Sequence, residues 1–108
     1  MKLEFQTLVI DMGNTKDEAP PVIEATSDTF SSSIITADAA IRSWKLEFTR
    51  SDHEVHQIFA EIQDVQLVDN ATRVKVSAKM GIRDDSGDWD DVYSGSVTAL
   101  IIASVSDN

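Results

Sequence analysis

Residues 72–82 alternate apolar and polar side chains without interruption, and this two-residue period constrains the fold more than any other feature of the chain. Because successive side chains of a β-strand point to opposite faces, the alternation predicts a strand with one apolar face. An acidic, glycine-containing turn follows, and a second strand-like run ends at Ala103. Residues 72–105 therefore predict a β-hairpin. The apolar positions of its first strand are Val74, Val76, Ala78, Met80 and Ile82.

The rest of the chain consists of further short strand-like runs separated by turn signals, and no stretch has the period of a three-turn amphipathic helix. Such spacing is typical of β-sandwiches and barrels. We expect an all-β fold, an antiparallel β-sandwich of six to seven strands. The length of 108 residues is close to the commonest size of one domain, so residues 1–108 are expected to form a single domain.

The strands predicted before the hairpin are an N-terminal one ending near Ile10, then 22–26, 41–49 and 55–68, with an edge strand or extended segment at 28–36. Residues 11–21 combine Gly, Asn, acidic residues and two prolines, which predicts a loop. The alternation changes phase within 55–68, which predicts a bulge near Gln63 and Asp64. The residues expected in the core are Phe5, Trp44, Leu46, Phe48, Phe59, Ile62, Val74, Val76, Met80, Val97, Leu100 and Ile102.

The last predicted strand is apolar on both faces. Tyr93, Val97, Ala99, Ile101 and Ala103 share one face, and Leu100 and Ile102 lie on the other. A strand that is apolar on both sides is covered on both sides, so this strand is expected to be central in a sheet.

The chain is strongly acidic, with 19 acidic and nine basic residues and a net charge of −10. This charge repels phosphate backbones and anionic lipids, so we expect no nucleic-acid or membrane partner. No run approaches the roughly 20 apolar residues of a membrane helix. The first residues also lack the pattern of a conventional signal peptide. The chain is therefore expected to be soluble, and cytoplasmic by default. Because it has no cysteine, disulfides and thiol chemistry are excluded.

Five aspartates lie within residues 84–91, around a glycine turn. Calcium prefers six to eight oxygen ligands, and Asp84, Asp88 and Asp90 are the candidate metal ligands. The spacing does not match an EF-hand, because the Gly falls at the fourth position and no Glu stands at the twelfth. The segment therefore predicts a solvated turn, with a calcium site as the alternative. No other cofactor is expected.

Trp89 lies in the middle of this acidic segment. An indole at a loop tip is poorly buried, and it can contact a ligand, a sugar ring or a neighbouring subunit. The candidate residues for ligand or partner binding are Trp89, Asp88, Asp90 and Tyr93. The competing interpretation is that Trp89 packs over the edge of the sandwich.

No catalytic residues are predicted. His53 and His56 are three apart, whereas the metalloprotease motif places two histidines four apart on a helix. No nucleophile elbow, phosphate-binding Gly loop or Ser-His-Asp pattern is present. We expect a non-enzymatic binding or assembly module that forms a homo-oligomer. The alternatives are a calcium-dependent binding module and a small hydrolase that uses paired carboxylates.

The order of the runs 44–48, 55–68, 72–82 and 92–103 resembles the H-type lectin domain, over about residues 41–105. That resemblance implies a six-stranded antiparallel sandwich that forms trimers or hexamers and binds N-acetylgalactosamine-type sugars between subunits. The family's late aromatic is replaced here by Ala99 and Leu100, and none of its sugar-contacting residues is placed on this sequence. The same runs also resemble small uncharacterised bacterial β-sandwich proteins, which imply no activity.

Overall fold

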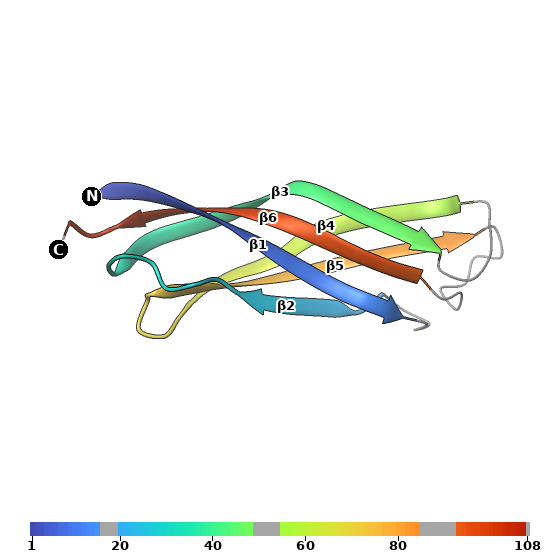
Figure 1. Cartoon of the computed structure of the whole chain (residues 1–108), viewed down its shortest axis with the longest axis horizontal. Helices are drawn as coiled ribbons and strands as arrows, with labels where there is room; N and C mark the ends of the chain where they lie inside the picture. The colour runs from blue at the N-terminus through green and yellow to red at the C-terminus, as the bar shows by residue number, and fades with distance from the viewer. Residues whose placement is uncertain (16–19, 49–54, 85–92, 108) are drawn as a thin grey trace.

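The computed structural model describes residues 1–15, 20–48, 55–84 and 93–107. These residues form six β-strands and no helix (Figure 1). The strands are β1 (Lys2–Thr15), β2 (Val22–Thr26), β3 (Ile34–Phe48), β4 (Val55–Val68), β5 (Arg73–Asp84) and β6 (Tyr93–Val105). The all-β prediction is confirmed.

The strands form two antiparallel three-stranded sheets, ordered β1-β6-β3 and β2-β5-β4, which pack as a β-sandwich. β6 is the central strand of its sheet, as its two apolar faces predict. The hairpin predicted from residues 72–105 is wrong, because β5 and β6 belong to different sheets. Both strands are central, and their apolar faces meet across the interior instead of lying side by side. The hairpin in this region joins β4 and β5 through a turn at 69–72.

Two strands are longer than predicted. β1 continues through residues 11–15, where a loop is predicted, because the ladder with β6 absorbs a register shift between Asp11 and Gly13. β3 runs unbroken from Ile34, although the sequence predicts a separate segment and then a strand from Ile41. A bulge between Ile41 and Ser43 breaks its alternation and hides this continuity. The bulge predicted in β4 is confirmed by the register shift between Ile62 and Asp64.

The core lies between the two central strands. Alternate residues of β6 from Tyr93 to Val105 are completely buried, and they face the buried side of β5. The buried apolar residues of β5 are Val74, Val76, Ala78, Met80 and Ile82. The core predictions for Val74, Val76, Met80 and Val97 are therefore confirmed. Leu46 and Ile62, from the edge strands, are half-buried against this core.

Five of the residues predicted in the core lie elsewhere. Leu100 pairs with Thr7 on the outer face of the β1-β6-β3 sheet, and Phe59 pairs with Gly81 on the outer face of the β2-β5-β4 sheet. Phe5 and Ile102 pair with each other on the outer face of the β1-β6-β3 sheet, and both are exposed. Trp44 pairs with Val97 and so faces inward, but it lies on the edge strand β3 and is 49% exposed. Alternation identifies which residues share a face, but it does not identify which of two apolar faces is turned inward.

Residues 27–33 close the end of the sandwich that also holds both chain termini (Figure 1). The amide groups of Ser27 and Phe30 donate to the carbonyl groups of Val74 and Thr72 at 2.8 Å, so this segment continues past β2 along β5. The Phe30 ring is buried in the core. The molecule is a rod with extents of 54 by 20 by 17 Å. The part of the chain described contains no helix able to span a membrane.

Candidate functional site

The outer face of the β1-β6-β3 sheet is divided along its length into an apolar half and a polar half. Residues directly opposite each other on paired strands share a face, so the ladder shows which side chains lie together. Near the chain termini Phe5 pairs with Ile102, and Thr7 pairs with Leu100. Toward the other end the outward positions become polar. This face therefore offers two surfaces of different chemistry.

The apolar half has no covering layer in the single chain. Leu3, Phe5 and Val9 are 58%, 59% and 60% exposed, Ile102 is 37% exposed, and Leu100 is half-buried. We call the residues Leu3, Phe5, Val9, Leu100 and Ile102 the outer patch. Among the described outward positions paired around it, Asp38 alone carries a charge.

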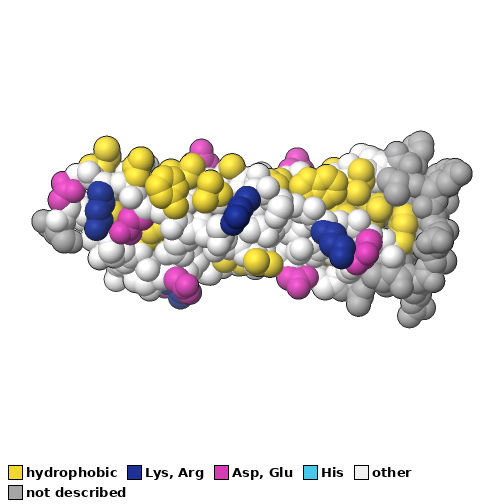
Figure 2. Space-filling view, turned by 45° about the horizontal axis from the view of Figure 1, so that its top comes forward, with side chains coloured by type: hydrophobic (Ala, Val, Ile, Leu, Met, Phe, Trp, Pro, Cys, Tyr) yellow, Lys and Arg dark blue, Asp and Glu magenta, His cyan; other side chains and the backbone are white. Residues whose placement is uncertain are grey.

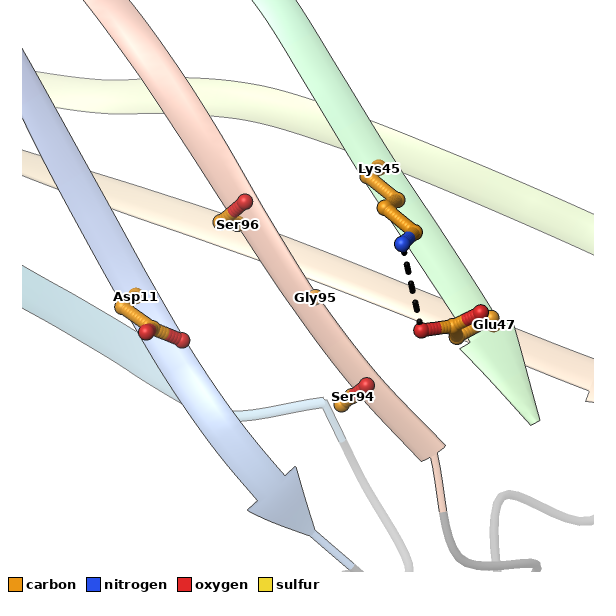
Figure 3. Close-up of a pocket in the computed structure, with 6 residues that line it drawn as sticks. All are labelled: Asp11, Lys45, Glu47, Ser94, Gly95 and Ser96. Carbon is orange, nitrogen blue, oxygen red and sulfur yellow. Dashed lines mark ion pairs between the residues drawn. The ribbon is translucent and has the colours of Figure 1, made fainter. Parts of the chain in front are cut away.

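The polar half contains a shallow pocket of about 190 Å³. Its lining residues are Asp11, Lys45, Glu47, Ser94, Gly95 and Ser96 (Figure 3). Three strands bring them together, because Ser96 of β6 pairs with Asp11 of β1 on one side and Lys45 of β3 on the other. Ser94 pairs with Glu47 in the same way. The pocket therefore combines two hydroxyl groups, two carboxylates and one ammonium group.

Two internal contacts shape this pocket. Lys45 Nζ lies 3.4 Å from Glu47 Oε1, and both side chains are well exposed, so the pair remains open to solvent and to ligands (Figure 3). On the opposite wall, the Gly13 amide donates a hydrogen bond to Asp11 Oδ1 at 2.8 Å. Gly13 adopts a φ of 66°, a conformation that glycine accepts without steric cost. The second oxygen of Asp11 remains available as an acceptor.

Gly95 lies beneath the pocket, at a position where a larger residue would clash with its neighbours. A Cβ added there would lie 2.9 Å from the Lys45 carbonyl oxygen and 3.1 Å from Met12 Cε, and it would also overlap Leu46 Cδ2. Because Gly95 has no side chain, Leu46 and Met12 pack over β6 and seal the inner side of the sheet. Ser94 and Ser96, on either side of Gly95, point to the outward face because successive side chains alternate along a strand.

A second hollow, of about 500 Å³, lies between the start of β1 and residues 29–31. On its floor the Ser31 amide donates to Glu4 Oε1 at 3.0 Å, and the Ser31 hydroxyl donates to Glu4 Oε2. These hydrogen bonds, the hydroxyl one first, lower the pKa of Glu4 below its usual range. The Gln6 side chain similarly exchanges hydrogen bonds with the backbone of Asp28. This hollow is therefore the place where β1 holds the end-closing segment.

The residues predicted to bind a ligand, partner or metal are mostly not described. Asp88, Trp89 and Asp90 lie outside the described residues, and only the backbone of Asp84 is described, at the end of β5. Tyr93 is fully buried at the start of β6. Its ring therefore belongs to the interior of the single chain. The predicted calcium site, the Trp89 contact and the carboxylate hydrolase stay predictions.

The described residues contain no group of three or more His, Cys, Asp or Glu side chains able to hold a metal ion. His53 lies outside them, and only the backbone of His56 is described. No family model, curated protein or solved structure matches the chain. The surfaces of the molecule are therefore the observations that bear on its function.

Neither the outer patch nor the polar pocket is predicted as a site from the sequence. The signal for the outer patch is present, because β1 and β6 both carry apolar residues at consecutive positions. Two apolar faces on strands of one sheet indicate that something covers the second face. The pocket has no comparable signal, because its residues come from three strands and assemble only through the ladder.

Proposed function

We propose that this chain is a non-enzymatic assembly module that forms a homo-oligomer through the outer patch. The single observation that carries the proposal is the row of exposed apolar side chains on the outer face of the β1-β6-β3 sheet. Figure 2 shows hydrophobic side chains gathered along one long side of the molecule, a band that extends beyond the outer patch and has charged side chains beside it. Contiguous apolar patches of this kind are typical of interaction surfaces and are uncommon on isolated monomers.

The size of the molecule supports a second copy as the occupant. The side that carries the outer patch measures 54 by 20 Å, so an interface centred on the patch has room to reach the roughly 800 Å² that each partner buries in a standard interface. The patch itself occupies only the apolar half of that side. Fully burying a large apolar side chain is worth about 1.5–3 kcal/mol, and about half of that remains to be gained at the exposed positions. Summed over both copies, the free energy gained by burying the outer patch is of the same order as the free-energy cost of association, about 4–15 kcal/mol. Hence the outer patch alone supports a contact of modest affinity.

The charge distribution also favours self-association at this surface. Two copies that each carry a net charge of −10 repel one another at long range. The outer patch is nearly free of charge, and the cores of protein interfaces are depleted of charged residues. Salt screens the repulsion between the acidic copies while leaving apolar contacts in place. Association is therefore expected to strengthen as the salt concentration rises.

Sedimentation velocity across micromolar concentrations tests this proposal. The wild-type chain is expected to show concentration-dependent association, and the double variant F5K/I102K is expected to sediment as a monomer. Val22→Lys is the matched control, because Val22 is 53% exposed on the outer face of the other sheet. A wild-type chain that stays monomeric at all salt concentrations would rule out the proposal.

We also propose a second candidate function, the binding of a polyhydroxylated ligand such as a carbohydrate in the polar pocket. The observation in its favour is that Ser94, Ser96, Asp11 and the Lys45–Glu47 pair present both donors and acceptors within one hollow. A glycan array tests it, with Lys45→Ala as the disabling variant. Lys75→Ala is the matched control, because Lys75 forms a comparable pair with Glu24 on the other sheet. Equal binding by both variants would contradict this candidate.

A further inference from the structure

A second apolar surface runs along the long side of the sandwich between the edge strands β3 and β4. Trp44, Ile58 and Leu67 pair with buried residues of the central strands, so they face inward, yet they are 49%, 39% and 41% exposed. We call this surface the open seam. Its remaining members are the half-buried residues Ala37, Ala39, Ile41, Leu46, Ala60, Ile62 and Val65. None of these residues is charged, in a chain with 26% charged residues.

The opposite side of the sandwich is treated differently. There the inward side chains at the start of β1 are Glu4 and Gln6, and both are hydrogen-bonded to residues 28–31. Polar side chains paired with a covering segment close that edge near the termini. The described residues place no such segment over the open seam. The exposed apolar side chains of the open seam are therefore specific to the side between β3 and β4, and they are not a general consequence of the small size of the sandwich.

We propose that the open seam of one copy packs against the outer patch of the next copy, so that the chains associate head to tail. This inference rests on the proposed homo-oligomer and specifies its contact. A two-fold interface centred on either surface alone brings that surface against itself and leaves the other apolar surface exposed. A head-to-tail contact uses both surfaces at once, and a closed ring of such contacts covers both in every copy. The seam also enlarges the contact beyond the modest area of the outer patch.

The shapes of the two surfaces agree with this arrangement. Over the half of the sheet nearest the chain termini, the outward positions of β3 carry short side chains, Thr36, Asp38 and Ala40, whereas those of β1 include Leu3, Phe5 and Val9. This half of the outer face is therefore stepped, low along β3 and high along β1. Farther along β3, the exposed side chains of Arg42, Lys45 and Glu47 end the low side. The edge of a second sandwich fits onto the low side and packs against the step. Trp44 supplies the kind of large, partly exposed anchor that dominates the binding energy of interfaces.

Mixing two variants tests the head-to-tail contact. The patch variant F5K/I102K and the seam variant W44K/L67K each remove one half of it. Both add positive charge to an acidic chain, so lost association cannot come from increased repulsion between copies. Each variant alone is expected to associate about tenfold or more weakly than wild type. An equimolar mixture is expected to form a one-to-one heterodimer, because one intact seam still meets one intact patch.

The outcomes separate this inference from the proposed function. A monomeric wild type overturns both. A seam variant that associates like wild type, or a mixture that stays monomeric although wild type associates, overturns the head-to-tail contact alone. Circular dichroism verifies that each variant is folded. If W44K/L67K does not fold, the milder variant Leu67→Gln replaces it, with the same expected loss of self-association and the same expected rescue by the patch variant.

Discussion

Phe5 of β1 and Ile102 of β6 lie directly opposite each other on the outer face of the sheet, while Ile101, the neighbour of Ile102 in the chain, is completely buried. Two adjacent isoleucines therefore occupy opposite sides of one central strand. The inner one belongs to the core of the single chain. The outer one belongs to a surface that gains its full burial only when another molecule covers it.

Alanine substitution at these two neighbouring positions is expected to give different losses of stability. Ile101→Ala leaves a cavity in a packed core and is expected to lower the free energy of unfolding by about 2–5 kcal/mol. Ile102→Ala is expected to cost about 1 kcal/mol or less, because surface truncations have small effects. Urea unfolding at protein concentrations below association measures both. Equal losses would show that the outer face is packed within the single chain.

Gly95→Ala is expected to destabilise the fold by about 1–3 kcal/mol through overpacking. The added methyl group meets the Lys45 carbonyl oxygen, Met12 and Leu46. Adding Leu46→Ala is expected to recover only part of the loss, because the backbone contact with Lys45 persists. A double-mutant cycle measured by urea unfolding tests this coupling.

Gly13→Ala is the control for that cycle. No atom lies within 4 Å of a Cβ at Gly13, so its cost of about 1–2 kcal/mol comes from the positive φ alone. Leu46→Ala is expected to leave this cost unchanged. Relief of both glycine variants by Leu46→Ala would contradict the steric explanation for Gly95.

Ser27→Ala is expected to cost about 1–3 kcal/mol, because it leaves a buried donor without its acceptor. The Val74 amide donates to Ser27 Oγ at 2.9 Å, where β2 has ended and the ladder along β5 would otherwise lose a partner. Hydrogen exchange at the Val74 amide is expected to accelerate. Ser43→Ala, at an exposed position of β3, is the control and should change stability by less than about 0.5 kcal/mol.

The all-β class, the bulge in β4 and the central place of β6 follow from the sequence, because each depends on the local alternation of side chains. The sequence does not predict that β5 pairs with β2 and β4 instead of with β6. A polar segment between two apolar strands is compatible both with a hairpin and with a crossing to the opposite sheet. Long-range packing of the two central strands decides between them.

The outer patch illustrates a second limit of the sequence. Phe5 and Ile102 are predicted in the core because large apolar side chains are usually buried. In the single chain both faces of the β1-β6-β3 sheet carry apolar side chains near the termini, and alternation does not separate the face turned to the core from the face turned outward. The polar pocket is a third case, because Asp11, Lys45 and Ser96 are far apart in sequence and meet only through strand register.

Glu4 is expected to make the free energy of unfolding depend on pH in the acid range. Its pKa is lowered, first by the Ser31 hydroxyl and then by the Ser31 amide, relative to the ordinary value of about 4.3 in the unfolded chain. Its contribution is therefore fully present above the unfolded value and is lost as the pH falls through the lower folded value. Ser31→Ala is expected to raise the pKa of Glu4, which carboxyl NMR titration measures. An unchanged pKa would contradict the assigned hydrogen bonds.

Ala71→Gly is expected to stabilise the fold, although most substitutions destabilise. Ala71 ends a run of three residues, Asp69, Asn70 and Ala71, with φ values of 53°, 56° and 61° in the turn between β4 and β5. The left-handed conformation costs alanine about 1–2 kcal/mol, and Ala71→Gly removes this cost. Glycine is itself destabilising by about 0.5–1 kcal/mol, because its unfolded chain has more conformational freedom to lose on folding. The expected net gain is about 0.5–1 kcal/mol in urea unfolding. Ala60→Gly, within extended β4, should instead lower stability, and a loss at both positions would mean that the turn carries no strain.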